Sequence, residues 1–189
     1  MTAENLLAAL HTAEKLKDAT RHCYTSGGRH ESVAEHSWRL ALMAYWLKDS
    51  FPDADMDKVI RMCLIHDLGE CFTGDIPTFD KTAADENREE ELLYNWVASL
   101  PAPFNAEMRA LYDEMAARET QEAKLYQALD NIEAVVQHNE SDISTWVPLE
   151  YKLNLTYGSD KAAFSPVMQA LRDVVREETL QKMAEHEQG

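Results

Sequence analysis

The amino-acid sequence predicts an all-α protein, and three observations lead to that class. Apolar residues recur every three or four positions through most of the 189 residues, which is the period of a helix with one buried face. Ser, Thr and Pro stand where several of these periodic segments begin. We find no run of alternating apolar and polar residues, which would indicate strands, and no internal repeat or Gly-rich phosphate loop.

The first helix is expected over about residues 3–19. Its buried side is predicted to hold four leucines: Leu6, Leu7, Leu10 and Leu16. Residues 20–30 then interrupt the helical pattern, and two adjacent glycines predict a flexible connection. This segment is rich in hydrogen-bond donors: Arg21, His22, Arg29 and His30. A solvated loop and a substrate-binding loop are equally good interpretations of it.

The second helix is predicted to begin at Val33, because Ser32 and Glu35 have the spacing of a capping box. His36 lies in the first turn of this helix. Three apolar residues follow it at offsets of four, seven and eleven: Leu40, Met43 and Leu47. His36 therefore extends the apolar stripe and is expected to point into the core.

The third helix is expected from Val59 through Glu70, with His66, Asp67 and Glu70 bordering one face. A single inward His is more often an ordinary core residue than a metal ligand. Asp67 changes that balance, because a buried carboxylate must be paired or metal-bound to offset its desolvation. Two inward His residues with an adjacent carboxylate therefore favour a metal site.

Asp75 follows in a turn near Pro77, where a carboxylate that bonds its own backbone is the plain structural interpretation. Further helices are predicted over residues 84–100, about 106–118, 121–140 and 166–183. Thr120 caps the helix of residues 121–140, and Asp130 lies in its interior beside the apolar stripe. An Asp in a helix interior either faces solvent or needs compensation, so Asp130 is the natural fourth ligand.

Charge and composition limit the functions to consider. The formal net charge of −16 argues against a general nucleic-acid-binding surface, which needs a basic face. The three cysteines show no C-x-x-C spacing and indicate reduced thiols. The first residues lack the pattern of a signal peptide, and no apolar run is long enough to span a membrane. We therefore expect a cytoplasmic protein with no membrane partner.

The order His, His-Asp, Asp over about a hundred residues resembles the HD-domain metal-dependent phosphohydrolases. The segments ESVAEHS, HDLGE, TGDIPT and EAKLYQALD look like the branch that contains bacterial 5′-deoxynucleotidases and their eukaryotic HD-domain relatives. The resemblance covers roughly residues 15–140. It implies an HD-domain helical bundle built around a central metal site. We expect a single domain over residues 1–189, with residues 141–185 packed as helices on a core of about residues 15–140.

The resemblance also implies roles for individual residues. It gives four ligands of one divalent metal ion: His36, His66, Asp67 and Asp130. Glu70 matches the acid/base residue of the family. The expected substrate-binding residues are Arg21, His22, Arg29, Asp75 and Lys81. His22 departs from the pattern, because a bacterial deoxynucleotidase of this branch has Trp there, associated with sugar recognition.

The implied activity is the hydrolysis of (deoxy)nucleoside 5′-monophosphates to nucleoside and phosphate. Two imidazoles and two carboxylates suit Co²⁺, Mn²⁺, Fe²⁺, Ni²⁺ or Zn²⁺ without choosing among them. The resemblance suggests a homodimer. Two alternatives stay open: another phosphate ester as substrate, such as a cyclic nucleotide, a nucleoside triphosphate or an alarmone, and a non-catalytic signalling or binding module. A di-iron oxygenase is disfavoured, because no His occurs between His66 and His138.

Overall fold

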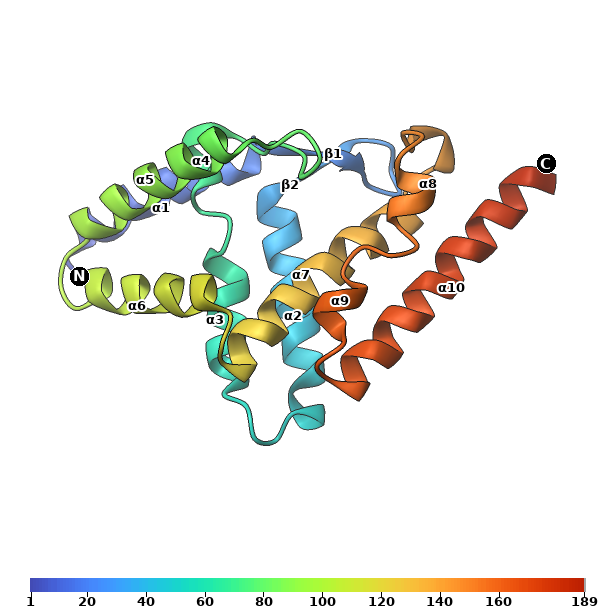
Figure 1. Ribbon diagram of the computed structural model, residues 1–189. Coiled ribbons are helices and arrows are strands. Elements are labelled where there is room, and N and C mark those ends of the chain that lie inside the picture. Colours follow the sequence, from blue (N-terminus) through green and yellow to red (C-terminus); the bar gives the residue numbers. More distant parts are fainter. Residues whose placement is uncertain (189) are drawn as a thin grey trace.

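Two helices, α2 (Val33–Leu47) and α3 (Met56–Ile65), pack against each other at the centre of the structure, and the long helix α7 (Gln121–Glu140) crosses both (Figure 1). This computed structural model describes residues 1–188. Fully buried aliphatic side chains fill the space among the three helices: Leu40, Val59, Leu125, Leu129 and Ile132. Removing such side chains from water stabilises the fold, so these helices form the frame that carries the site.

The start of α2 agrees with the prediction. The Ser32 hydroxyl accepts a hydrogen bond from the Glu35 backbone N–H, and the Glu35 carboxylate accepts one from the Ser32 N–H at 2.9 Å. This capping box satisfies backbone donors that a helix start otherwise leaves free. It fixes the first turn and holds His36 in the core, where only 1% of the residue is exposed.

The third helix ends earlier than predicted. α3 stops at Ile65, residues 66–69 form a turn, and Glu70 begins the separate short helix α4 (Glu70–Thr73). Gly69 lies in this turn, and a Cβ atom there would come within 2.7 Å of the Glu89 side chain of α5 (Ala83–Ser99). A close approach of this kind requires glycine. His66 and Asp67, the first two residues of this turn, both lie beside His36 of α2.

Residues 20–30 are not the flexible connection that we predicted. They form most of an antiparallel hairpin of β1 (Thr20–Tyr24) and β2 (His30–Ser32), the one sheet of the described chain. Gly28 supplies the positive φ of 82° in its turn. Gln137 of α7 donates a hydrogen bond to the Tyr24 carbonyl at 2.6 Å. This anchor on a distant helix leaves no periodic signal in the local sequence.

The first helix also differs from its prediction. α1 spans Ala3–Ala13, and a short 3₁₀ helix continues it over Glu14–Lys17. Leu16 is buried as predicted, at 5% exposure. The buried side predicted for the other leucines is wrong, because they are about half exposed: Leu6 47%, Leu7 54% and Leu10 53%. No other part of the described chain covers this face of α1.

The remaining helices lie on both sides of the central three (Figure 1). They are α6 (Phe104–Ala117), α8 (Glu150–Leu153), α9 (Ser159–Ala162) and α10 (Pro166–Gln188). α10 continues five residues past the predicted end and packs on α7, where Thr179 donates a hydrogen bond to the Asn139 side chain at 2.9 Å. Within residues 1–188, none of the helices combines the length and apolarity needed to cross a membrane.

Candidate metal centre and substrate cleft

Side chains from α2, from the turn after α3 and from α7 meet in one place. They are the four predicted ligands: His36, His66, Asp67 and Asp130. Nε2 of His36 lies 3.2 Å from Nε2 of His66 and 3.0 Å from Oδ1 of Asp130. Nε2 of His66 lies 2.9 Å from Oδ2 of Asp67. Asp130 therefore faces the two imidazoles, and the structure brings all four residues together.

Hydrogen bonds on the far side of each imidazole determine which nitrogen faces the cluster. Nδ1 of His66 lies 2.9 Å from the Cys63 carbonyl oxygen, which can only accept, so this nitrogen carries a proton. Nδ1 of His36 donates in the same way to the carboxylate of Glu133. When the imidazoles are neutral, both Nε2 atoms direct lone pairs at each other and at two carboxylate oxygens. A cation between them would satisfy both nitrogens and both carboxylate oxygens.

A divalent ion fits this donor set. Donor atoms that lie about 2.1 Å from an ion and at right angles to one another are about 3.0 Å apart. The separations in the cluster run from 2.9 to 3.8 Å, close to that value. Four protein donors on a six-coordinate ion leave positions open for a substrate.

Glu133 supports the cluster from behind, and we did not predict it. It lies on α7, is fully buried and also accepts a hydrogen bond from Nε of Arg39 at 2.6 Å. Burial raises the pKa of this carboxyl, but His36, Arg21 and Arg39 outweigh it and lower the pKa to about 2. Glu133 is therefore a carboxylate that holds the His36 ring with Nε2 toward the ligands, as a carboxylate behind a metal-binding His does.

Glu133→Gln is expected to weaken metal binding by about 10-fold to 100-fold, the usual effect of losing such a partner. The amide keeps the shape of the side chain but loses the charge that orients His36. Competition titration with a metal indicator measures the affinity. Glu140→Gln is the matched control, because Glu140 also binds Arg39 but is not a partner of His36. Equal affinity in Glu133→Gln and the wild type would contradict the orienting role.

Glu70 is a buried acid beside the cluster. Only 6% of the residue is exposed, and its Oε2 has no hydrogen-bond partner in the described part of the chain. Burial, followed by the charges of Asp67 and Asp75, raises the pKa of Glu70 to about 10. A divalent cation at the cluster would oppose this shift. Without it the carboxyl is protonated at neutral pH, so this group can donate a proton.

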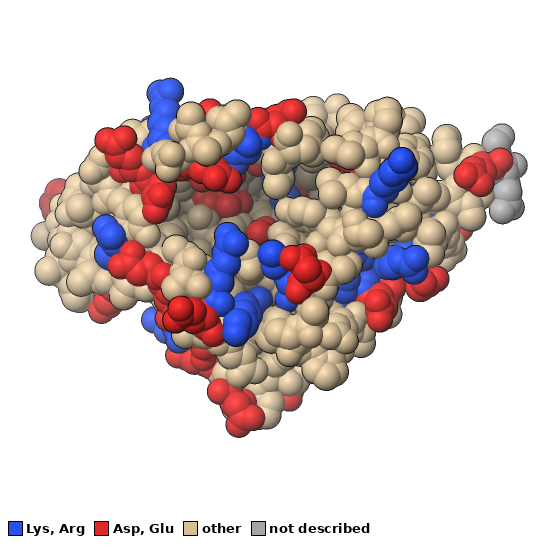
Figure 2. Space-filling model, viewed as in Figure 1, with Lys and Arg blue, Asp and Glu red and all other residues tan. Residues whose placement is uncertain are grey.

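A cleft of about 630 Å³ lies over the cluster, and four of its lining acids are Asp67, Glu70, Asp75 and Asp130. This volume is in the usual range of small-molecule sites. Figure 2 shows the face that carries a hollow with acidic side chains inside it and basic side chains along its lower rim. Four cationic residues line the cleft: Arg21, Lys81, Arg118 and Lys161. They supply local positive charge in a protein whose net charge is −16.

Three of the predicted substrate-binding residues line the cleft: Arg21, Asp75 and Lys81. Arg21 lies 3.3 Å from a carboxylate oxygen of Glu31 and 3.3 Å from one of Glu133. Lys81 lies 2.8 Å from Glu89. Burial raises the pKa of Asp75. An anionic substrate would therefore have to share both cations with protein carboxylates.

Arg29 does not lie with the other predicted residues. It follows the hairpin turn, 63% of its side chain is exposed, and its guanidinium pairs with the carboxylate of Glu35. It lines a separate hollow with Trp38 and Arg39. The structure therefore does not support the prediction that Arg29 binds the substrate together with Arg21.

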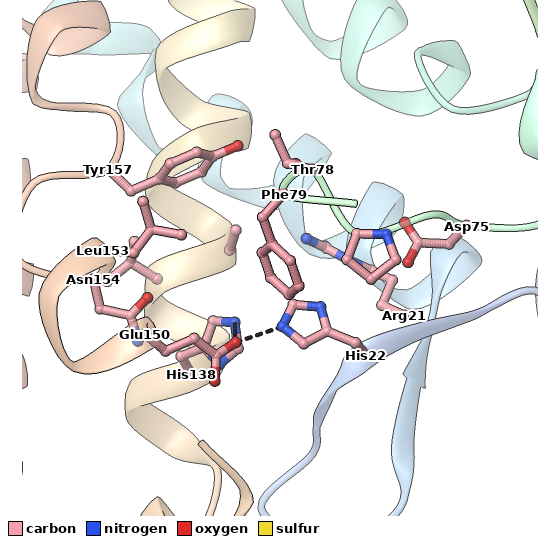
Figure 3. A pocket seen from close by; sticks show the side chains of 13 residues that line it. Arg21, His22, Asp75, Thr78, Phe79, His138, Glu150, Leu153, Asn154 and Tyr157 are labelled. Atoms are coloured by element: carbon pink, nitrogen blue, oxygen red, sulfur yellow. Dashed lines mark hydrogen bonds and ion pairs between the residues drawn. The ribbon is translucent and has the colours of Figure 1, made fainter. Parts of the chain in front are cut away.

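His22 lies in a side chamber that adjoins the cleft and shares Arg21 and Asp75 with it (Figure 3). Nε2 of His22 lies 2.5 Å from Oε1 of Glu150, a residue of α8. The Phe79 ring packs edge-on against the imidazole, with 5.3 Å between ring centroids. The imidazole is thus held in one orientation by a carboxylate and an aromatic ring.

The functional candidates that we missed left different signals in the sequence. Glu133 follows Asp130 by three positions, so both face the same side of α7, and this spacing could have been recognised. Arg118 ends α6 with a positive φ of 56°, and its position beside the cleft depends on tertiary packing. Glu150 stands in a short helix that we did not predict, so nothing local indicated its contact with His22.

A helical bundle that gathers two His and two Asp residues under a small-molecule cleft defines a class of metal-dependent hydrolases. Within that class, the chain belongs to the HD domain family, whose model matches residues 13–172. This finding and the architecture confirm the predicted family and the predicted all-α HD-domain fold. They also support the prediction that the chain is a hydrolase.

Relatives and solved structures agree with the family. The chain is 34% identical over 142 residues to the 5′-deoxynucleotidase HDDC2 of Homo sapiens, covering 73% of this chain and 69% of that protein. It is 31% identical over 140 residues to the 5′-deoxynucleotidase YBR242W of Saccharomyces cerevisiae, covering 70% of this chain and 58% of that protein. A solved protein described as a predicted metal-dependent phosphohydrolase, from Magnetospirillum magnetotacticum MS-1, superposes with a TM-score of 0.79 at 28% identity, covering 95% of this chain and 93% of that chain.

Proposed function

We propose that this protein is a metal-dependent phosphomonoesterase that hydrolyses (deoxy)nucleoside 5′-monophosphates to nucleoside and phosphate. The observation that carries the proposal is the convergence of His36, His66, Asp67 and Asp130 beside the buried acid Glu70. The names of the relatives, 5′-deoxynucleotidases, support the substrate class. The four cations that line the cleft support an anionic substrate.

In this proposal His36, His66, Asp67 and Asp130 hold one divalent ion. Such an ion, when bound, polarises a phosphoryl oxygen and lowers the pKa of water in the site. The mixed nitrogen and oxygen donor set supports Co²⁺, Mn²⁺, Fe²⁺, Ni²⁺ or Zn²⁺.

Side chains of the protein donate the proton, bind the phosphate and contact the sugar. Glu70 donates a proton to the sugar oxygen that leaves the phosphate, which its raised pKa favours. Arg21 and Lys81 bind phosphate oxygens from the cleft wall. Asp75 lines both the cleft and the side chamber, which supports a contact with the sugar between them.

The function can be tested with a panel of ribo- and deoxynucleoside 5′-monophosphates, assayed for released phosphate with each of the five metals. Release that requires one of these metals and is fastest with the monophosphates supports the proposal. Hydrolysis of cyclic nucleotides, nucleoside triphosphates or alarmones in preference to monophosphates would identify a different phosphohydrolase. Absence of turnover with every ester, in protein that binds metal, would favour a binding module.

The sugar preference depends on His22 in this proposal. We expect wild type to prefer dAMP over AMP only modestly, because a steric contact discriminates by about 10-fold to 200-fold. His22→Trp places a larger ring beside the sugar and should sharpen the preference. The measurement is the ratio of kcat/KM for the two substrates. His11→Trp, at an exposed position of α1, is the control. Rejection of AMP by several thousandfold in wild type, or an unchanged ratio in His22→Trp, would show that a residue other than His22 discriminates between the two sugars.

We also propose that residues 1–189 form a single domain and that the enzyme is a cytoplasmic homodimer. Packing of α10 on α7 supports one domain. The exposed leucines of α1 support a protein contact on that face, since contiguous apolar surface often marks one. The three cysteines are buried and unpaired with one another, which supports a reducing compartment. Sedimentation velocity measures the oligomeric state directly.

A further inference from the structure

Arg118 differs from the other three cations that line the cleft. Each of those already has a carboxylate partner: Arg21 pairs with Glu133, Lys81 with Glu89, and Lys161 with Asp160. Within residues 1–188, the Arg118 guanidinium forms no ion pair with a carboxylate. Its positive charge is therefore open to an anion that enters the cleft, because no carboxylate of the described chain competes for it.

The backbone of Arg118 is in the left-handed region, with φ 56° and ψ 27°. The residue ends α6, and its N–H donates a hydrogen bond to the Glu114 carbonyl at 3.2 Å. Glycine usually occupies such a position at the end of a helix, because a side chain is crowded there. Within residues 1–188, Arg118 is the one non-glycine residue with a positive φ. Backbone strain of this kind is concentrated at functional sites.

The side-chain amide of Gln127 holds the Arg118 guanidinium. With its oxygen turned toward Arg118, this amide accepts hydrogen bonds from Nε at 3.1 Å and from Nη1 at 3.2 Å. A guanidinium has five N–H groups, so one on Nη1 and two on Nη2 are left for a ligand. Arg118 is an exposed residue that lines the cleft, so a ligand can reach these groups. Two adjacent nitrogens of this kind can bind two oxygens of one phosphate.

The contact with Gln127 places the guanidinium at the metal end of the cleft. Gln127 precedes Asp130 by three positions on α7, and both residues line the cleft. Residues three apart on a helix are neighbours, with about 5–6 Å between their Cβ atoms. Tyr126 also lines the cleft, and its ring packs against His66 with 5.7 Å between centroids. The Arg118 guanidinium is therefore held about one helical turn from a predicted metal ligand.

We propose that Arg118 binds the phosphate group whose ester bond is hydrolysed, through hydrogen bonds from Nη1 and Nη2. This inference rests on the proposed phosphomonoesterase activity, and it adds a phosphate-binding residue from the connection between α6 and α7. Arg21 and Lys81 bind the same group in the proposed function, but both share their charge with carboxylates. Arg118 does not share its charge, so its loss should weaken phosphate binding strongly.

The test uses Arg118→Gly, which removes the guanidinium and suits the left-handed backbone. For the metal-loaded protein, we expect the Kd of inorganic phosphate to rise about 10-fold to 100-fold, the effect of losing hydrogen bonds to a charged group. The Tm should equal or exceed that of wild type, because glycine relieves the strain. Isothermal calorimetry measures the Kd, and thermal unfolding measures the Tm. Arg118→Lys keeps the charge without the two-nitrogen fork and should recover part of the affinity.

Lys124→Met is the matched control, since Lys124 is an exposed cation of α7 that does not line the cleft. Its Kd for phosphate should equal that of wild type. An equal loss of affinity in Lys124→Met and Arg118→Gly would overturn the proposal, because the general charge of this surface would then explain both. A lower Tm in Arg118→Gly with no recovery of affinity in Arg118→Lys would also overturn it, because Arg118 would then act on the fold.

Phosphate binding separates this inference from the proposed function, because calorimetry needs no turnover. If the protein hydrolyses nucleoside 5′-monophosphates, kcat/KM for the best of them should fall at least tenfold in Arg118→Gly and stay unchanged in Lys124→Met. Weaker phosphate binding in Arg118→Gly would support the role of Arg118 even if no nucleotide were hydrolysed. Equal phosphate affinity in wild type and Arg118→Gly, or no measurable binding by wild type, would overturn the inference whatever the enzyme assay shows.

Discussion

Glu70→Ala is expected to lower kcat by about two to four orders of magnitude, the usual scale for the loss of a general acid. The reason is geometric and electrostatic. Glu70 lines the cleft beside Asp67, and burial raises the pKa of its carboxyl, which favours a proton that can pass to the leaving oxygen. Metal content should stay at the wild-type value, because the four ligands are untouched. Steady-state kinetics together with elemental analysis of the purified protein measures both quantities.

The acid role of Glu70 also predicts the direction in which activity changes with pH. A group whose pKa is raised is in its acid form below that pKa, so activity that needs the proton is lost as pH rises through it. A bound divalent cation lowers the pKa of Glu70 below the metal-free value of about 10, so the alkaline limb should fall below that pH. Glu70→Gln should be nearly inactive, and its residual activity should not fall as pH rises through this range. Turnover near the wild-type rate in either variant would contradict the acid role.

Asp130→Ala is expected to remove both metal and activity. Asp130 is the one ligand that α7 contributes, and its Oδ1 lies 3.0 Å from Nε2 of His36 and 3.7 Å from Nε2 of His66. Without it, three donors remain for an ion that prefers more, and activity should fall to background. Elemental analysis after dialysis measures the bound metal. Asp173→Ala, at an exposed position of α10, is the control and should keep the wild-type metal content. Full metal content in Asp130→Ala would show that Asp130 is not a metal ligand.

The parts of the fold that local chemistry determines were predictable. The capping box of Ser32 and Glu35 set the start of α2, and the Thr120 cap set the start of α7, because each satisfies nearby backbone donors. Convergence of the ligands was predictable for a related reason. A His or Asp on an apolar helix face has to find a partner once it is buried.

The parts that tertiary contacts determine were not predictable. The hairpin strands carry no alternating pattern, and a contact that anchors them comes from Gln137, more than a hundred residues along the chain. α3 ends at Ile65 and the Glu89 side chain of α5 lies close to Gly69, and neither feature has a signal in the local sequence. The leucines of α1 have helical spacing, but spacing does not say whether anything covers them. The position of Glu150 depends on the contact between α8 and the hairpin, where it meets His22.

The continuity of α7 makes it a molecular ruler. Asp130 marks the metal end and His138 the chamber end, and eight residues of one helix separate them by about 12 Å. Because the helix is unbroken between them, this length cannot adapt to the substrate. A ligand that touches both the metal-binding residues and His138 therefore has to match a distance that the backbone of α7 fixes.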